Sequence, residues 1–352
     1  MKTHHITLAE FLVEAAQGLS PENQLATLVL NIAGTVKAIS KLTEKGALAD
    51  MYGKLESRNI QGETQMKLDV ISNQIFIDNL TRSGLVAGLA SEEMDTPVLI
   101  ADDKDKGAFL VIFDPLDGSS NVAVNVSVGS IFSVLHVPTH GLPQNSDYLQ
   151  AGKKQIAAGY ALYGPCTMLV LTIGKGTHGF TLDCDTDEFV LTHPNILIPE
   201  DTAEYAINAS NERFWEPPIK RYTNECRAGA TDRREKDFNM RWVASMVADI
   251  HRILMRGGIY LYPKDSKDVT KPGRLRLMYE ANPMGMLVEQ AGGLASTGRV
   301  RILEIQPEEI HQRVPVVMGS RNEVLRVERY HNAYDTGTDD VSPLFNDRSF
   351  YR

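Results

Sequence analysis

The sequence predicts a mixed α and β protein that folds as two lobes. Its 352 residues are more than one hydrophobic core of typical size supports, so two lobes are expected. Amphipathic helical patterns dominate residues 7–83, and short apolar runs typical of strands follow them. Hydrophobic residues make up 43% and charged residues 23% of the chain, which is ordinary for a globular protein.

Three helices are expected in the first part of the chain. Residues 7–18 carry apolar side chains at helical spacing, and Thr7 with Glu10 three residues later suits the helix start. A second helix is expected over about 22–42 and a third over about 68–83. Between them the Gly-rich, polar stretch 45–66 is predicted to be a loop.

Strand-like sequence follows the third helix. Strands are expected at 85–90, 99–102, 108–113, 128–136, 156–162 and 168–173. Residues 180–191 are read as one further strand, paired in a hairpin with the strand before it. The connector 194–199 is the expected boundary between the lobes.

The second half of the chain alternates short strands with helices. Strands are expected at 206–208, 259–261 and 316–319, with helices after 208, at 242–255 and at 281–290. Ala291-Gly292-Gly293 suits a helix C-cap. We therefore expect an N-terminal lobe over 1–198, a C-terminal lobe over 199–335 and an extended tail over 336–352.

Composition excludes several classes of protein. With 36 Lys+Arg against 45 Asp+Glu the net charge is −9, so no overall basic field gathers nucleic acid or an anionic membrane. We find neither a run of about 18 apolar residues nor a secretory signal, and we expect a cytoplasmic protein without a membrane span. Cys166, Cys184 and Cys226 are scattered, which argues against a disulfide framework and a zinc site.

One glycine motif invites a wrong interpretation. Gly174 to Gly179 match GxGxxG after an apolar run, as in dinucleotide-binding proteins. That fingerprint needs a helix to open at the last glycine, whereas the following GFTLDCDTDEFVLT alternates with period two. We therefore expect the glycines to form a hairpin turn.

The strongest signal is the acidic string FDPLDGSSN over residues 113–121. Asp114 and Asp117 lie three residues apart across a proline, which is expected to end the preceding strand. Gly118, Ser119 and Ser120 then offer N–H groups and hydroxyls. Carboxylates beside such a group of N–H donors can hold divalent metal and phosphate together. For a bare DxxD, an Asx turn would be the simpler interpretation.

Further carboxylates lie upstream of this string. Glu92 and Glu93 follow the strand at 85–90, and Asp69 lies in the first turn of the third helix. Taken separately, Glu92 and Glu93 could be a solvated surface pair, and Asp69 could be a charge that interacts with a helix N-terminus. Together with Asp114 and Asp117 they suggest a two-metal phosphoester hydrolase.

The combination resembles the signature of the metal-dependent, lithium-sensitive sugar phosphatase superfamily. The inositol monophosphatase branch ends in Trp-Asp-x-Ala-Ala, whereas residues 274–284 read RLRLMYEANPM, which resembles class I fructose-1,6-bisphosphatase. The matching motifs are KLDVISN, SEE, FDPLDGSSN, SVGSIF, SMVADIHR, GGIYLYP, LMYEANPM and GS at 319–320. The resemblance spans about residues 8–330 and implies that family's fold: two mixed α/β lobes of layered helices and sheets, with the site between them.

The resemblance also implies an activity. Members of the family hydrolyse D-fructose 1,6-bisphosphate to D-fructose 6-phosphate and phosphate, in gluconeogenesis or the Calvin cycle, by attack of a metal-activated water. Two or three Mg²⁺ per subunit are implied, with Mn²⁺ or Zn²⁺ as alternatives. A homotetramer is the implied assembly, and a sugar bisphosphate is the implied partner.

Site residues follow from the matching positions. The implied metal ligands are Glu92, Glu93, Asp114, the carbonyl of Leu116, Asp117 and Glu280. The implied catalytic residues, which activate the attacking water, are Asp69 and Glu93. The implied substrate-binding residues are Asp117, Gly118, Ser119 and Ser120 for the cleaved phosphate, and Asn208, Tyr262, Arg274, Arg276 and a neighbouring subunit's Arg241 elsewhere. Arg276 is expected on the same strand as Glu280, balancing its charge.

Three positions depart from the family pattern and bear on the substrate. Trp242 and Asn211 stand where phosphate-binding tyrosines are usual, and Arg274 replaces a lysine. Loss of the tyrosine hydroxyls could leave room for a longer sugar, so sedoheptulose-1,7-bisphosphatase or a dual-specificity enzyme is the alternative. An inactive regulatory homologue is a further, weaker alternative, because the carboxylate set is intact.

Regulation is also expected to differ. Ala26, Ala108 and Phe109 replace the threonine and the lysine–tyrosine pair of the family's AMP site, so weak or absent AMP inhibition is expected. The stretch before residue 156 lacks the cysteine-bearing insertion of the chloroplast type, so that thiol switch is not expected. Both absences fit the proteobacterial branch. Residues 46–66 match the family's mobile loop.

Overall fold

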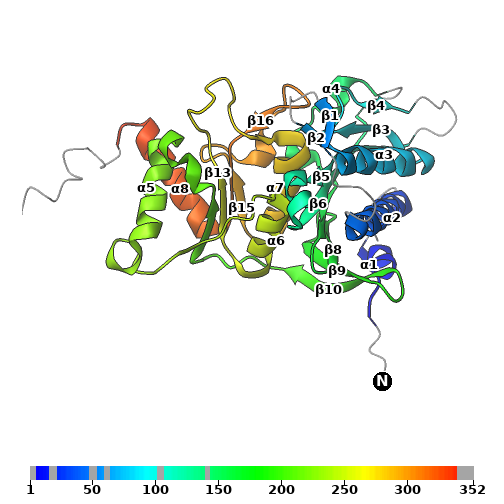
Figure 1. Cartoon of the computed structure of the whole chain (residues 1–352), viewed down its shortest axis with the longest axis horizontal. Helices are drawn as coiled ribbons and strands as arrows, with labels where there is room; N and C mark the ends of the chain where they lie inside the picture. Colours follow the sequence, from blue (N-terminus) through cyan, green and yellow to red (C-terminus); the bar gives the residue numbers. More distant parts are fainter. Residues whose placement is uncertain are drawn as a thin grey trace, which may run out of the picture.

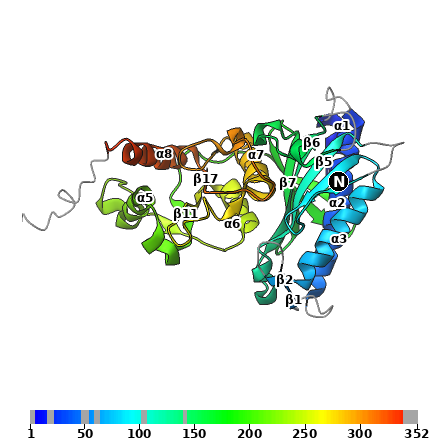
Figure 2. The same cartoon turned by 90° about the horizontal axis from the view of Figure 1, so that it is seen from above.

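The computed structural model describes residues 5–15, 22–46, 54–58, 64–100, 107–138 and 143–338 (Figure 1). Seen from above in Figure 2, helices and sheets alternate along the longest axis of the molecule. An eight-stranded sheet has helices on both faces, and the inner helices also cover a five-stranded sheet, which has its own outer helices. The predicted class of layered helices and sheets is confirmed.

The outer layer of the first sheet holds the predicted N-terminal helices. They are α1 (Leu8–Ala15), α2 (Glu22–Lys45) and α3 (Lys67–Arg82), and residues 16–21 lie outside the described residues. The N-cap is confirmed: Glu10 N–H donates to Thr7 Oγ1 at 3.2 Å, and Thr7 N–H donates to the Glu10 carboxylate at 2.8 Å.

The prediction of a loop over 45–66 is wrong in part. β1 (Lys54–Arg58) and β2 (Thr64–Met66) pair antiparallel in a two-stranded sheet of their own. Their sequences, KLESR and TQM, contain too few apolar residues to produce an alternating pattern, so periodicity could not reveal them. Residues 47–53 and 59–63 of the expected mobile loop lie outside the described residues.

The eight-stranded sheet has the order β10-β9-β8-β7-β6-β5-β3-β4. Its strands are β3 (Val86–Ser91), β4 (Val98–Leu99), β5 (Phe109–Asp117), β6 (Val128–His136), β7 (Ala157–Tyr163), β8 (Thr167–Thr172), β9 (Thr177–Asp183) and β10 (Glu188–Ile196). Among these described strands only β3 and β5 pair parallel; the other neighbours pair antiparallel. Each strand predicted before residue 174 has a counterpart: β6 has the predicted bounds, and the ends of the others differ. Residues 101–102 of the strand predicted over 99–102 lie outside the described residues.

Two expectations about the glycine motif and its continuation have different outcomes. β8 and β9 pair antiparallel across the turn that holds Gly174 and Gly176, whose φ angles are 83° and 84°, so the hairpin is confirmed. The single strand predicted over 180–191 is wrong, because the chain turns between β9 and β10. The charged run DCDTDE, with Asp187 at φ 57°, forms that turn.

The five-stranded sheet has the order β12-β11-β13-β17-β15. Its strands are β11 (Glu204–Ile207), β12 (Asn239–Met240), β13 (Ile259–Tyr262), β15 (Leu294–Ser296) and β17 (Val316–Gly319). α6 (Met246–Arg256) and α7 (Asn282–Gln290) lie between the two sheets, and α5 (Pro217–Ala228) and α8 (Arg321–Asp335) cover the outer face. The predicted strands near 206, 259 and 316 and helices near 242 and 281 are confirmed.

Short elements complete the described chain. They are α4 (Asn145–Tyr148), the 3₁₀ helices η2 (Ser119–Val124), η3 (Gly152–Lys154), η4 (Ala209–Phe214), η5 (Gly229–Thr231) and η7 (Ile302–Glu304), the π-helix η6 (Leu277–Ala281), and the pair β14 (Leu275–Arg276) with β16 (Arg313–Val314). The π-helix η6 contacts β5 and β6, and Figure 1 shows α7, which follows η6 in the chain, beside β6 where the two lobes meet.

Helix α8 was not predicted from the sequence, and it ends just before the tail expected over 336–352. Its Val324, Val327 and Tyr330 are buried against α5 and the five-stranded sheet, while charged residues cover the other face. Helix therefore continues through Asp335, and residues 339–352 of the predicted tail lie outside the described residues.

Three large hydrophobic cores fill the spaces between the layers of the described chain. The first joins α1–α3 to the large sheet, the second joins both sheets to α6 and α7, and the third joins the small sheet to α5 and α8. Residues 24–45 of α2 are long and apolar enough to cross a membrane by length and composition. Half of that window is buried, and Leu28, Ile32 and Val36 lie in the first core, as in the core helix of a globular domain.

Candidate active site

A cavity of about 590 Å³ lies where the ends of β3 and β5 meet the start of α3 and the π-helix η6. Its lining comprises Met66, Asp69, Glu92, Glu93, Asp114, Leu116, Asp117, Gly118, Ser119, Ser120, Ala123, Arg276 and Glu280. Every residue predicted as catalytic or metal-binding is in this set, and so are the predicted cradle for the cleaved phosphate and Arg276. We call it the carboxylate cavity.

Strand β5 places two of these carboxylates in a way that the sequence did not predict. Pro115 does not end the strand, which runs on to Asp117 with a register shift against β6 between Asp114 and Asp117. The Pro115 carbonyl accepts a hydrogen bond from Ser130 Oγ at 2.8 Å, and Asp114 Oδ1 accepts the Leu116 N–H at 2.9 Å. The bulge thus lets both aspartates line one cavity.

Asp117 is fixed by residues far along the chain. Its Oδ2 accepts hydrogen bonds from Ser245 Oγ at 3.1 Å and from the Val247 N–H at 2.8 Å. The next residue, Gly118, has a φ of 76°, and a Cβ there would lie 2.8 Å from the Cβ of Ser245. Only glycine therefore allows this close approach between the phosphate cradle and the start of α6.

The prediction that Arg276 and Glu280 lie on the same strand is wrong. Arg276 ends β14, and Glu280 lies in the π-helix that follows. The Arg276 backbone N–H donates to Glu280 Oε2 at 2.6 Å, and its guanidinium lies 2.8 Å from Glu92 Oε1 and 3.9 Å from Glu280 Oε2. The expected charge balance is present, but it is shared between two glutamates.

Burial raises the pKa values of Asp69, Glu92, Asp114, Asp117 and Glu280, and repulsion between neighbouring carboxylates adds to the effect. Burial brings the pKa of Asp69 to about 7, with a smaller contribution from Glu93. It brings the pKa of Glu92 to about 8 and that of Glu280 to about 7, although Arg276 opposes both shifts. Burial also raises the pKa of Asp117 to about 6 and that of Asp114 well above its usual range.

The donor chemistry of the cavity fits divalent cations. Carboxylate and carbonyl oxygens are the ligands that Mg²⁺ and Mn²⁺ prefer. Glu92 Oε2 is buried without a hydrogen-bond partner, which leaves an oxygen that a cation would satisfy. Among the described residues, no group of three His, Cys, Asp or Glu side chains could hold a metal ion as it stands. Metal binding would therefore have to draw the carboxylates closer together.

A second polar group lies apart from the lining of the carboxylate cavity. Asn208, Asn211, Tyr262 and Asp265 line a small pocket between η4 and the end of β13. Arg274 joins this group through two hydrogen bonds to Asp265, of 3.2 and 2.9 Å. Burial raises the pKa of Tyr262, while Arg274 lowers it and Glu280 raises it further. The phenol therefore lies within electrostatic range of both the second polar group and the carboxylate cavity.

Arg241 belongs to neither pocket lining. Its side chain is 52% exposed, and its Nε lies 3.3 Å from Glu204 Oε1. The adjacent Trp242 stacks on Tyr260 with a centroid distance of 5.7 Å and contacts the Tyr262 ring at 5.7 Å. The Trp242 ring therefore covers the side of Tyr262, while the arginine points away to the surface.

Sequence reasoning missed Ser245, Val247 and Asp265. Ser245 and Val247 fall in the SMVADIHR motif, which was recognised without a role for its residues. Asp265 is nine residues before Arg274, and a charge pair over that spacing has no local signature. The signal that could have found Ser245 is its position as N-cap of α6, directly before an apolar helix.

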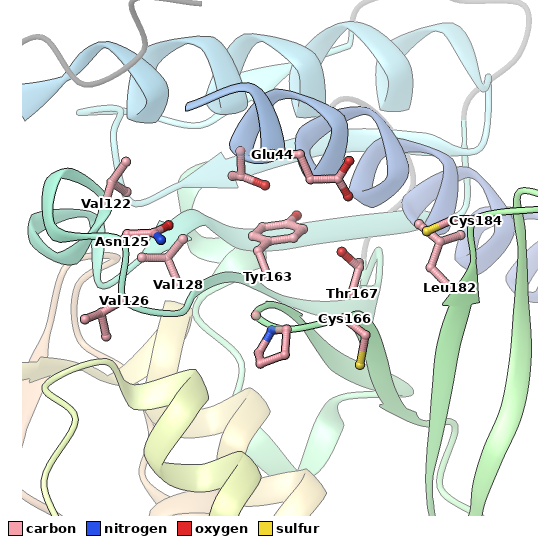
Figure 3. A pocket seen from close by; sticks show the side chains of 13 residues that line it. Glu44, Val122, Asn125, Val126, Val128, Tyr163, Cys166, Thr167, Leu182 and Cys184 are labelled. Carbon is pink, nitrogen blue, oxygen red and sulfur yellow. The ribbon is translucent and has the colours of Figure 1, made fainter. Parts of the chain in front are cut away.

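A further cavity of about 400 Å³ lies between the end of α2, η2 and the β7–β8 turn (Figure 3). Tyr163, Cys166, Thr167 and Cys184 line it, and both cysteines are exposed free thiols, as expected in the absence of a disulfide framework. Its lining contains no residue of the predicted site. Tyr163 connects it to the bulge of β5, because its hydroxyl is 2.9 Å from Ser130 Oγ.

Comparison with known proteins agrees with this geometry. Residues 6–194 match the family described as "Fructose-1-6-bisphosphatase, N-terminal domain", and residues 198–332 match its C-terminal domain. The chain is 55% identical over 353 residues to the class 1 fructose-1,6-bisphosphatase of Hydrogenophilus thermoluteolus, covering 99% of this chain and 98% of that protein.

Solved structures give the same result for the fold. Crystal structures of Leishmania major fructose-1,6-bisphosphatase match with TM-scores of 0.87 for the holo form and 0.82 for the apo form, at 40% and 39% identity. Each covers 94% of this chain and 100% of the Leishmania chain. The chain therefore belongs to the fructose-1,6-bisphosphatase family, and it is a phosphoric monoester hydrolase that converts D-fructose 1,6-bisphosphate to D-fructose 6-phosphate and phosphate.

Proposed function

We propose that hydrolysis takes place in the carboxylate cavity with Mg²⁺ as the metal. The observation that carries the proposal is the convergence of buried carboxylates and the Gly118–Ser120 cradle on one cavity. The ions would be held by Glu92, Glu93, Asp114, the Leu116 carbonyl, Asp117 and Glu280. Bound divalent ions supply charge stabilisation for phosphoryl transfer and lower the pKa of water.

The chain's own groups would position the substrate and move the proton. The N–H groups and hydroxyls of residues 118–120 bind the phosphate that is cleaved. Asp69, with Glu93, accepts the proton of the attacking water, and a pKa of about 7 suits a base that works near neutral pH. The Met66 N–H holds the Asp69 carboxylate in place with a hydrogen bond of 2.8 Å to Oδ2.

The phosphate that stays would be bound by the second polar group. Asn208 offers an amide and Tyr262 a phenol. Arg274, which is hydrogen-bonded to Asp265, offers a positive charge.

We also propose sedoheptulose 1,7-bisphosphate as a second substrate, and one observation supports it. Asn211 lines this pocket beside Asn208 with a short side chain, where the family pattern has a phenol.

The first test is phosphate release from both bisphosphates, with and without EDTA. We expect turnover of fructose 1,6-bisphosphate that EDTA abolishes and excess Mg²⁺ restores, and slower turnover of sedoheptulose 1,7-bisphosphate. Turnover that persists after exhaustive chelation would contradict the metal assignment. A complete lack of activity on the seven-carbon sugar would remove the second substrate.

We propose that Arg241 binds the distal phosphate in the active site of a neighbouring subunit of a homotetramer. Its half-exposed side chain and its distance from the lining of both pockets support that role. Arg241→Ala should raise KM for fructose 1,6-bisphosphate at least about tenfold and change kcat little, because one charge-assisted contact is lost in ground and transition state alike. Steady-state kinetics with mass determination in solution test this, and an unchanged KM in a tetramer would contradict it.

The lobe boundary, the location in the cell, the pathway and AMP inhibition are proposed from the resemblance to the family. We propose the lobe boundary between residues 198 and 199, because β10 ends at Ile196 in one sheet and β11 begins the other at Glu204. Cytoplasmic location, a role in gluconeogenesis or the Calvin cycle, and weak AMP inhibition stay predictions. For the last, Phe109 is fully buried in the first core and Ala26 packs against it.

A further inference from the structure

Residues 241–245 form a short segment between β12 and α6 that lies against Asp117. Ser245 is the N-cap of α6 and donates through Oγ to Asp117 Oδ2 at 3.1 Å. The preceding Ala244 has a φ of 66°, a left-handed conformation that is costly for any residue with a Cβ. A segment strained in this way keeps its shape only when surrounding contacts hold it.

The contacts that hold this segment come mainly from α6 itself. Asp249 is fully buried, and its Oδ2 accepts the Val243 N–H at 3.1 Å. Its Oδ1 accepts from Arg252 Nη1 at 2.7 Å, and Arg252 Nη2 donates to the Arg241 carbonyl at 3.3 Å. Asp249 and Arg252 together therefore bind the segment near its start and at its middle.

A third contact ties the segment to the phosphate cradle. Asn121 Nδ2 donates to the Ala244 carbonyl at 3.1 Å, and Asn121 follows Ser120 directly in η2. Gly118 lies against Ser245 so closely that a Cβ would approach Ser245 Oγ to 2.9 Å. A small shift of residues 243–245 would therefore move the donors of Asp117 and disturb the cradle at the same time.

The consequence for Asp117 is a fixed orientation. Both donors, Ser245 Oγ and the Val247 N–H, bind the same oxygen, Oδ2. The carboxylate plane is thereby set, and Oδ1 is the oxygen left for the cavity. Hydrogen-bond partners that orient a metal ligand in this way typically change metal affinity by about 10- to 100-fold when they are removed.

We propose that Asp249 is a positioning residue for Asp117. It holds the strained segment so that Ser245 and Val247 direct one Asp117 oxygen into the cavity. The inference rests on the proposed role of Asp117 as a metal ligand. Asp249 itself is absent from the lining of the cavity, so it acts through the segment and not by contact with substrate.

The test measures Mn²⁺ binding to the purified, metal-free, full-length protein by the loss of the free-ion electron paramagnetic resonance signal, without substrate. Asp249→Asn keeps the size of the side chain but weakens the attraction to Arg252, and we expect about tenfold weaker Mn²⁺ binding. Ser245→Ala should weaken binding by a similar factor. The Asp249→Asn/Ser245→Ala double variant should bind Mn²⁺ as well as the single variant with the lower affinity. The two effects should not add, because both substitutions act through the contact between Ser245 and Asp117.

Matched variants separate the outcomes. Arg256→Gln alters an exposed arginine at the far end of the same helix, which pairs with Glu204, and Mn²⁺ affinity should not change. If Asp249→Asn fails to fold, Arg252→Lys removes the forked contact to Asp249 and the Arg241 carbonyl and should weaken binding likewise. The inference is overturned if a folded Asp249→Asn or Arg252→Lys protein binds Mn²⁺ with wild-type affinity. This holds also where the variant has a lower melting temperature than the wild type.

Asp117→Ala distinguishes this inference from the proposed function. If Asp117→Ala binds Mn²⁺ as the wild type does, the metal assignment of Asp117 is wrong. If Asp117→Ala loses binding while folded Asp249→Asn keeps it, the metal assignment stands and only the positioning role fails.

Discussion

Asp117→Ala is expected to abolish phosphate release while the chain remains folded. Asp117 lies at the junction of the proposed functions, because it lines the carboxylate cavity and adjoins the Gly118–Ser120 cradle. Its removal takes away a hard oxygen ligand and a charge that orients the substrate. The adjacent residues Leu116 and Gly118 have no carboxylate that could replace it. We expect kcat to fall by at least about 10⁴-fold, as when a group essential to the chemistry is deleted.

The fold should tolerate this substitution because Asp117 is an unfavourable charge in the metal-free protein. Burial and the charges of Glu92 and Asp249 raise its pKa, so its removal relieves repulsion. The cost is the loss of acceptors for Ser245 Oγ and the Val247 N–H. These effects oppose each other, so the melting temperature of the metal-free variant should lie close to that of the wild type.

A matched control is Glu225→Gln, which changes a buried carboxylate far from the cavity. Glu225 accepts a hydrogen bond from the Tyr330 hydroxyl between α5 and α8. That variant should keep its activity within a few fold, whatever its stability. Near-normal turnover of a folded Asp117→Ala protein would contradict the assignment of a two-metal site to this cavity.

The acidic string shows what the sequence could predict and what it could not. Asp114, Asp117 and the glycine–serine cradle were predicted as one site, because they are adjacent in the chain and carry complementary chemistry. The bulge at Pro115 was not predicted, because proline normally ends a strand and only the pairing of β5 with β6 shows that this one does not. Local sequence therefore indicated which groups share the cavity but not the backbone geometry that orients them.

Contacts between distant residues account for the other omissions. Ser245 lies 128 residues from Asp117, and a single sequence contains no signal for such a hydrogen bond. Arg276 and Glu280 were correctly grouped, but the π-helix that begins after Arg276 and contains Glu280 has no pattern distinct from that of a strand of buried apolar residues. The paired strands β1 and β2 were missed for a related reason, since the partner of each is the other and their short polar sequences show no apolar alternation.

The thermal stability of the metal-free protein is expected to fall as pH rises from 6.5 to 8.5. In the unfolded chain the cavity carboxyls ionise near pH 4. In the folded chain burial raises the pKa of Asp69 and Glu280 to about 7 and that of Glu92 to about 8. The native state therefore binds more protons than the unfolded state in this window, so the free energy of unfolding decreases with rising pH.

The buried histidines act in the opposite direction, and only at the lower end of the window. Burial lowers the pKa values of His251, His311 and His331, so the stability they contribute rises as pH passes through about 6.5 and is nearly constant above about pH 7.5, where the effect of the carboxyls continues. Each extra bound proton changes the free energy of unfolding by about 1.4 kcal/mol per pH unit. A decrease in melting temperature on the order of 5 °C is expected across the window.

Divalent metal should remove most of this dependence, because cations bind the ionised carboxylates and compete with protons. In saturating Mg²⁺ the melting temperature should therefore be nearly constant over the same window, so that the stabilisation by metal increases with pH. Glu92→Gln removes a carboxyl whose pKa burial raises to about 8 and should flatten the metal-free curve, whereas Asp183→Asn, at an exposed position, should not. A metal-free melting temperature that is flat or rises with pH would show that the cavity carboxylates are already ionised in the folded protein. In that case Arg276 would have to supply the compensating charge that we assign to bound cations.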